Sequence, residues 1–204
     1  MFGAIRTITG ALVALAIFAG PAVASSSVDL SNPAFAPTGG NTSVPIGAAE
    51  FCKTHRRDCA PNVGAEMETL TDASWRQLIA INDRVNSAVA PVTDKDLYNI
   101  TEFWTYPAGR GDCEDYALEK RRELIAEGWS AGALMMTVVR QADGEGHAVL
   151  MVRTDRGDLV LDNQDGRVLV WNDTPYEFVK RQSQTDPRKW VGITDARVVL
   201  ASAR

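Results

Sequence analysis

Residues 111–117 read Gly111-Asp112-Cys113-Glu114-Asp115-Tyr116-Ala117, a pattern that predicts the start of a helix. Asp112 is a suitable N-cap, and Gly128 is a natural C-terminal stop. Counted at about 100° per residue, the apolar positions fall on two sides, so the helix should be buried on more than one side. The first side holds Cys113, Tyr116, Ala117 and Leu124, and the second holds Leu118 and Ile125. Lys120 falls within the first side, so its amino group must reach solvent or find a carboxylate.

The N-terminus has the features of a secretory signal peptide. Arg6 precedes an unbroken apolar run from Ala11 to Ala19, and Ala22-Val23-Ala24 has the small-x-small form that signal peptidase accepts. A membrane anchor is the alternative, but the run is shorter than the roughly 20 apolar residues that a bilayer span needs. We therefore expect an exported protein. Its parts would be a signal peptide at residues 1–24, a loosely ordered leader at 25–43 and a single folded domain at 44–204.

The charge balance argues against nucleic acid as a partner. The chain has 21 Lys and Arg against 26 Asp and Glu, a net charge of −5, and cleavage after Ala24 would remove Arg6 and make it −6. Such a charge disfavours contact with a phosphate backbone. No second apolar stretch is long enough to span a membrane, so we expect no stable membrane insertion after the signal peptide is removed.

Two of the three cysteines are candidates for a disulfide. Cys52 and Cys59 bracket a basic stretch, residues 53–58, and an exported protein meets an oxidising environment. A metal pair is the alternative, although the spacing is wider than the C-x₂₋₄-C of zinc sites. A bond between Cys52 and Cys59 would leave Cys113 as an unpaired thiol. An unpaired thiol that survives export is buried and inert, bonded to another chain, or used chemically.

The periodicity changes along the chain from helical to strand-like. Helices are expected first, at residues 48–55, 71–88 and 112–128. Short runs rich in Val, Leu and Met follow, divided by Gly, Asp and Asn turns, at residues 134–139, 147–152, 158–161, 167–171 and 197–201. Helices followed by strands predict an α+β domain with an antiparallel sheet.

A thiol nucleophile needs a base, and the chain has only two histidines. His55 lies in the basic stretch between the two paired cysteines and is most simply a solvated surface residue. His147 opens the apolar run of residues 148–152, at the edge of a buried strand. A hydrogen-bonded structural role is the alternative for His147.

Asp162 favours the catalytic interpretation of His147. Asp162 ends the next apolar run, and a hairpin turn within residues 154–157 would set His147 opposite residues 163–167. A bulge or a one-residue change in the turn would bring the Asp162 carboxylate closer to the imidazole. A carboxylate there would orient the ring and stabilise its charge, although Asp162 could also be a simple turn residue. We therefore predict a nucleophile, base and orienting acid in Cys113, His147 and Asp162.

The neighbours of Cys113 act against its ionisation. A helix N-terminus favours a thiolate, but Asp112, Glu114 and Asp115 place three carboxylates beside the same sulfur. These acids either compensate the helix dipole or supply oxygen ligands to a hard cation such as calcium. Trp104, nine residues before the cysteine, is a core aromatic residue or an oxyanion donor through its indole N–H.

Residues 111–117, the preceding Trp-x-x-Pro segment, the strand histidine and the Leu-Asp-Asn at 161–163 resemble the bacterial transglutaminase-like cysteine proteinases. The resemblance covers about residues 44–190. It implies a papain-like/transglutaminase-like fold, in which the nucleophile opens a central helix packed on an antiparallel sheet. It also implies a triad of Cys113, His147 and Asp162, and a calcium ion held by Asp112 and Glu114. Known members are periplasmic proteases that release surface adhesins and so control biofilm.

The hypothesis from the sequence is a periplasmic or secreted cysteine peptidase that cleaves a protein substrate, such as a surface adhesin, through a thioester. The thioester could meet an amine instead of water, which would make the protein an acyl transferase. A catalytically silent binding module of the same fold, with a structural calcium, is the third alternative.

Overall fold

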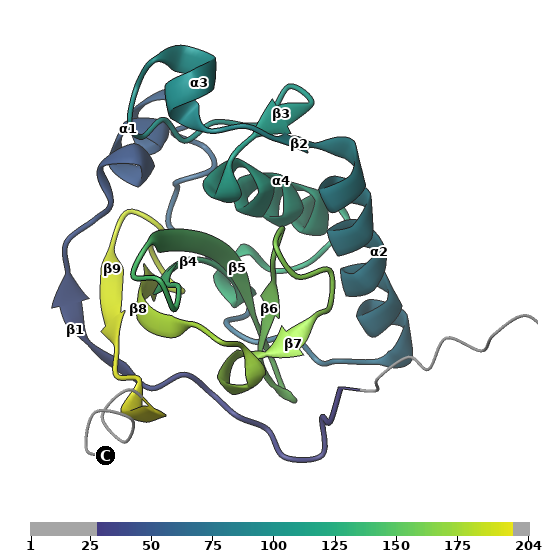
Figure 1. Cartoon of the computed structure of the whole chain (residues 1–204). Helices are drawn as coiled ribbons and strands as arrows, with labels where there is room; N and C mark the ends of the chain where they lie inside the picture. Colours follow the sequence, from purple (N-terminus) through teal and green to yellow (C-terminus); the bar gives the residue numbers. More distant parts are fainter. Residues whose placement is uncertain (1–27, 198–204) are drawn as a thin grey trace, which may run out of the picture.

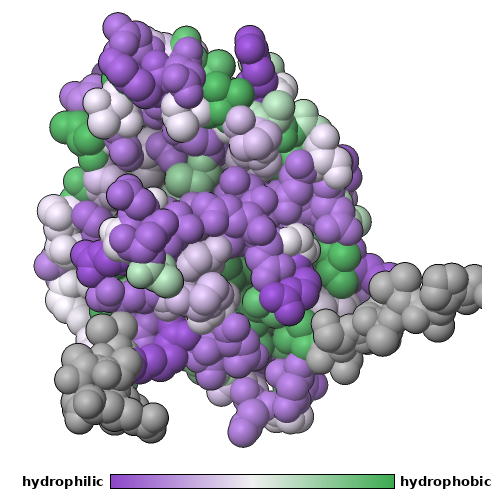
Figure 2. All heavy atoms as spheres, in the orientation of Figure 1, coloured by the Kyte–Doolittle hydropathy of each residue, from purple (hydrophilic) through white to green (hydrophobic). Residues whose placement is uncertain are grey.

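The structure is a computed structural model that describes residues 28–197. The predicted signal peptide lies outside the described residues, as does most of the strand predicted at 197–201. Within the described part, no helix is long and apolar enough to cross a bilayer. The face of the molecule seen in Figure 2 is mostly hydrophilic, with only scattered hydrophobic residues.

The chain folds into helices and an antiparallel sheet (Figure 1), which confirms the predicted α+β class. The helices are α1 (Ile46–Thr54), α2 (Asp72–Ala88), α3 (Asp94–Tyr98) and α4 (Cys113–Ala126). The main sheet holds seven strands in the order β1-β9-β8-β4-β5-β6-β7, each antiparallel to its neighbours. These strands are β1 (Thr38–Thr42), β4 (Leu134–Arg140), β5 (Gly146–Thr154), β6 (Gly157–Leu161), β7 (Leu169–Val170), β8 (Glu177–Gln182) and β9 (Trp190–Ile193). Two short parallel strands, β2 (Ala90–Pro91) and β3 (Arg110–Gly111), precede α4.

The core lies between α4 and the middle of the sheet. Helix α4 packs on β5 and β4, and α2 packs beside α4 (Figure 1). Strand β5 is buried along nearly its whole length, and α4 is buried on more than one side as predicted, although Ile125 of the second apolar side is exposed. This packing places the first residue of α4 against β5.

Local sequence signals account for the two long helices. Thr71 caps α2 through a capping box with Ser74, and α4 begins directly after Asp112. Asp112 holds the N-cap position, but its side chain makes no capping hydrogen bond. Gly128 follows the end of α4 with a φ of 96°, a conformation that glycine adopts without strain.

The sequence did not predict helix α3 or strands β1, β2, β3, β8 and β9. Strand β1 lies within the predicted leader, where it is fully exposed and pairs with β9 at the sheet edge. Strand β8 is rich in polar residues, and its Arg181 and Gln182 are buried. Helix α3 has only 5 residues. These elements are short or rich in polar residues, so they give little of the apolar period that signals a helix or a strand.

The predicted disulfide is confirmed. Cys52 and Cys59 are bonded, with their Cα atoms 5.5 Å apart, and Cys113 is the free cysteine among the described residues. The bond ties the end of α1 to the loop that follows it.

Replacing both Cys52 and Cys59 with serine is expected to lower the free energy of unfolding by about 2–3 kcal/mol, because the short closed loop no longer restricts the unfolded chain. Urea unfolding of the variant and the parent measures the difference. Reducing the parent with dithiothreitol should give the same loss. An unchanged unfolding midpoint in both experiments would contradict a stabilising role for this bond.

Candidate active site

Cys113 is the first residue of α4 and faces β5. Its sulfur accepts a hydrogen bond from the backbone N–H of Ala148, with Sγ 3.4 Å from the nitrogen, and its thiol donates to Glu114 Oε2 at 3.0 Å. Gly111 allows this tight entry into the helix, because a Cβ atom at that position would lie 2.4 Å from Asp115 Oδ2. The nucleophile candidate therefore sits beside the residue that follows His147.

His147 and Asp162 form a buried pair. His147 Nε2 lies 2.8 Å from Asp162 Oδ1, and each residue is only 3% exposed. The carboxylate has two further donors, the backbone N–H of Gln164 to Oδ1 at 3.0 Å and the Tyr176 hydroxyl to Oδ2. Burial opposes the charge of Asp162, but the hydrogen bonds from His147, Tyr176 and Gln164 outweigh it and hold the pKa of this carboxyl below its usual value.

The strand register explains why Asp162 reaches His147. In the hairpin, Leu150 pairs with Leu161 and Thr154 pairs with Gly157. The same register, continued past the end of β6, sets His147 opposite Gln164. Asp162 is two residues away on the same face, and such diagonal neighbours lie within reach of long side chains. No bulge is needed, because the His147 and Asp162 side chains span the two-residue offset between their positions in the hairpin.

The structure does not join Cys113 to His147 by a hydrogen bond. Among residues 28–197, the thiol donates to Glu114, and His147 Nδ1 lies 3.4 Å from the side-chain amide nitrogen of Gln164. Gln164 is exposed, so its amide can leave the imidazole. Transfer of the thiol proton to Nδ1 requires both partners to move away.

Burial and neighbouring charges raise the pKa values of Glu114 and Asp115. Burial, and then the Asp112 charge, raise the pKa of Glu114 to about 8. Burial is also the largest cause that raises the pKa of Asp115 to about 7, against a hydrogen bond from the Thr105 N–H. Burial and the Glu114 carboxylate raise the pKa of the Cys113 thiol as well. The electrostatic conflict expected from the sequence is therefore present.

Three acids near Cys113 form a cluster that could hold a cation. One ligand atom from each of Asp94, Asp112 and Glu114 lies within 4.8 Å of the others. Asp94 Oδ1 and Asp112 Oδ1 are buried and have no hydrogen-bond partner among the described residues. Asp94 was not anticipated from the sequence. It starts the short helix α3, and its backbone N–H donates to Asp112 Oδ2 at 3.1 Å, so only the fold brings it to the cysteine.

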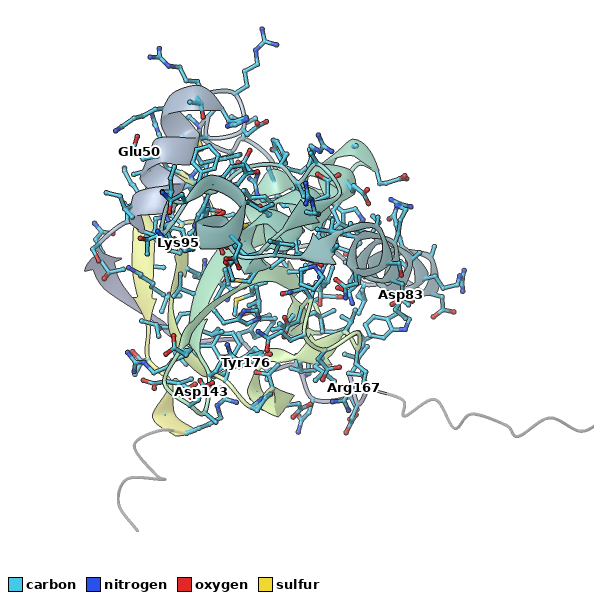
Figure 3. All side chains as sticks on the ribbon, turned by 45° about the horizontal axis from the view of Figure 1, so that its top comes forward. Glu50, Asp83, Lys95, Asp143, Arg167 and Tyr176 are labelled. Carbon is cyan, nitrogen blue, oxygen red and sulfur yellow. A yellow bond between two sulfur atoms is a disulfide. The ribbon has the colours of Figure 1, made fainter. Side chains whose placement is uncertain are left out.

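Trp104 is buried, and its indole N–H donates to Glu102 Oε1 at 2.7 Å. An oxyanion role for Trp104 would require this hydrogen bond to break. Tyr176 and Gln164, which contact the His147–Asp162 pair, were also missed from the sequence. Tyr176 lies just before β8, a strand with no apolar period, and is labelled near the middle of Figure 3.

Within residues 28–197, Lys120 neither reaches solvent nor forms a salt bridge. It is 0% exposed, and Nζ has no hydrogen-bond partner among the described residues and lies 6.0 Å from the centroid of the Tyr116 ring. Burial lowers the pKa of Lys120 to about 7, while the more distant charges of Asp162 and Asp83 oppose that shift. Helix α4 thus carries a buried amine behind the candidate triad.

Replacing Lys120 with methionine is expected to raise the free energy of unfolding by about 1–3 kcal/mol at pH 6, because a buried charge without a hydrogen bond is removed. The amine titrates at about pH 7 in the folded chain and at about 10.4 when unfolded. Between these two pH values the unfolded chain binds more protons than the folded chain, so the free energy of unfolding rises with pH. The cost of the buried Lys120 charge is therefore full below the folded pKa and is lost as pH rises to the unfolded pKa. Urea unfolding at pH 6 and pH 10 measures the effect. Lys95→Met, on exposed α3, is the control; a less stable Lys120 variant at pH 6 would contradict this account.

Papain-like and transglutaminase-like cysteine hydrolases place a thiol at the start of a helix, and that helix packs on an antiparallel sheet that carries a His–Asp pair. The fold places this chain in that class. A profile of the bacterial transglutaminase-like cysteine proteinases matches residues 38–198. The chain belongs to this family, which confirms the resemblance seen in the sequence.

Solved structures of LapG from Legionella pneumophila are similar to this chain. The calcium-bound form is 25% identical over 53% of this chain and 64% of that one, with a TM-score of 0.47. The EGTA-treated form is 22% identical over 62% of this chain and 74% of that one, with a TM-score of 0.49. The chain thus spans less than two thirds of the calcium-bound structure. No curated protein matches the chain.

Proposed function

We propose that this protein is an exported cysteine peptidase that cleaves a protein substrate with Cys113, His147 and Asp162. The observation that carries the proposal is the His147–Asp162 hydrogen bond of 2.8 Å on the strand whose next residue, Ala148, donates to the Cys113 sulfur. Family membership supports the same activity. A periplasmic or secreted location is part of the proposal, as the N-terminal sequence predicts.

The geometry suggests which nitrogen of His147 is the base. When Nε2–H donates to Asp162, the neutral ring has its lone pair on Nδ1. Nδ1 would take the thiol proton as Cys113 Sγ attacks the peptide carbonyl carbon, forming the S–C bond. The imidazolium then gives that proton to the leaving amine as the C–N bond breaks. Water hydrolyses the resulting thioester, and Asp162 stabilises the charged ring throughout.

Acyl transfer is the nearest alternative, because an amine can replace water in the last step. Incorporation of a labelled primary amine into a glutamine-containing protein tests it. We expect peptide hydrolysis without such incorporation. Amine incorporation faster than hydrolysis would reassign the enzyme to transglutaminase chemistry.

We also propose that Asp94, Asp112 and Glu114 bind calcium. The residues fit a hard cation, since three carboxylates converge and two of their buried oxygens lack partners among the described residues. LapG has been solved in a calcium-bound form. A bound Ca²⁺ supplies fixed positive charge that offsets the carboxylates around the nucleophile. Glu114 would then serve as a ligand instead of accepting the hydrogen bond from the Cys113 thiol.

Removing calcium with EGTA is expected to lower peptidase activity at least about 10-fold and to lower the melting temperature, because the clustered carboxylates repel one another without it. Calcium should restore both, and magnesium should not. Asp94→Asn should reproduce the loss, and Asp96→Asn, at an exposed position of the same helix, should not. If neither EGTA nor Asp94→Asn changes activity or melting temperature, calcium has no role here.

The substrate is proposed to be a surface adhesin, on the basis of family resemblance. The direct test compares the proteins released from cells that carry the intact chain with those from cells that carry Cys113→Ala. A large surface protein should be shortened only in the first strain. Identical released proteins in both strains would exclude this substrate class.

A further inference from the structure

A pocket of about 450 Å³ lies between the disulfide loop and the C-terminal half of α4. Its lining includes Arg57, Tyr106, Arg121, Arg122 and Ile125, and none of the triad residues. The loop of Arg57 follows α1, which Glu50 marks in Figure 3. The pocket is therefore separate from the candidate active site, and the proposed peptidase mechanism makes no use of it.

Arg121 is the buried charge of this pocket. It is 6% exposed, and its only hydrogen bond among the described residues runs from Nε to the Leu134 carbonyl at 3.1 Å. Its Nη2 is buried without a partner there. Burial lowers the pKa of the guanidinium, while the nearby Tyr106 and Asp58 oppose that shift. A buried guanidinium with unused donors is costly, and a small shift of the Arg121 side chain would bring Nη2 to an oxyanion in the pocket.

The other charges leave the pocket positive. Arg122 is engaged elsewhere, since it pairs with Glu119 at 2.5 Å and lies 4.6 Å from the centroid of the Tyr106 ring. Arg57 forms no salt bridge among the described residues. Asp58 is the one acidic residue of the lining. With Arg122 paired to Glu119, Arg57 and Arg121 against Asp58 still leave the pocket lining positive in a chain whose net charge is −5.

The walls of the pocket are held in place independently of any ligand. The Cys52–Cys59 bond restrains the loop that carries Arg57. The Asn62 backbone N–H donates to the Thr185 carbonyl at 2.8 Å, and its side-chain amide donates to the Gln184 carbonyl at 2.7 Å. Such fixed walls lower the entropy cost of binding a small molecule.

We propose that this pocket binds a small organic anion through its carboxylate or phosphate group. Arg121 is the anchor, because a planar guanidinium with free donors matches both oxyanions in a bidentate geometry. Arg57 closes on the anion from the exposed rim. The aromatic face of Tyr106 and the side chain of Ile125 contact the apolar body of the ligand.

The test uses titration calorimetry on the exported chain at constant ionic strength, with benzoate and phenyl phosphate as probes and benzyl alcohol as the uncharged match. We expect saturable 1:1 binding of at least one anion and none of the alcohol. Whichever anion binds identifies carboxylate or phosphate as the natural group. Saturation by neither anion, or equal binding of the alcohol, would overturn the proposal.

Variants separate a built site from general charge attraction. Arg121→Gln should weaken binding at least about 10-fold, and Arg57→Gln about 5-fold or more, since each removes a charged hydrogen bond to the anion. Arg56→Gln is the matched control, because Arg56 is exposed next to Arg57 but does not line the pocket. If Arg121→Gln does not fold, Arg57→Gln alone decides. Equal weakening by Arg56→Gln and Arg57→Gln, or no weakening by Arg57→Gln, would refute the site.

Discussion

Replacing Cys113 with alanine is expected to lower kcat/KM for a peptide substrate by about 10⁴-fold or more, to the background rate. The thiol is the only free one among the described residues, and the other two cysteines form the disulfide. Without Sγ there is no atom to form the thioester, and His147 has no proton to accept. A fluorogenic peptide or a purified protein substrate measures the loss.

The same substitution should leave the melting temperature within about 2 °C of the parent. Alanine keeps the Cβ atom and removes only the thiol hydrogen bond to Glu114 and the weak acceptor of the Ala148 N–H. Differential scanning calorimetry checks this point, and Cys113→Ser provides a second inactive variant of nearly the same shape. A fully active Cys113→Ala protein would disprove the proposed mechanism.

Replacing Asp162 with asparagine is expected to lower kcat/KM by about 10²–10⁴-fold. The carboxylate accepts from His147, Tyr176 and the Gln164 N–H, so all of its observed partners are donors. An amide removes the negative charge that stabilises the imidazolium, and its NH₂ group must face one of those donors. The reacting ring then loses its charge partner and its fixed tautomer.

Two variants locate the origin of that effect. Asp165→Asn is the control, since Asp165 lies three residues later and pairs with Arg167 outside the His147 contact. Tyr176→Phe removes one donor but keeps the charge, so it should cost about 10-fold or less. Steady-state kinetics over a range of pH gives all three values. An Asp162→Asn enzyme as fast as the Asp165→Asn control would rule out an orienting carboxylate.

The sequence predicted the parts of the fold that depend on local signals. The helix predicted at residues 71–88 is α2, and Gly128 follows the end of α4 as expected, because caps and turn residues act on their own neighbours. The disulfide was also predictable, since its cysteines are separated by only 7 positions in a polar loop. Strand β8 could not be predicted, because it buries the polar residues Arg181 and Gln182, whose side chains form hydrogen bonds inside the fold.

The sequence by itself determined the nature of the candidate chemistry: one cysteine left over by a disulfide, one strand histidine and one acid at a strand end. Only the tertiary structure decided what surrounds them. Asp94 reaches the Asp112–Glu114 pair from a separate short helix, and Tyr176 reaches Asp162 from the approach to β8. Such contacts join residues far apart in the chain, so they depend on helix and strand packing that no local pattern records. The hydrogen bond from the Cys113 thiol to Glu114 also depends on tertiary packing, because packing of α4 against β5 buries both groups at the start of the helix.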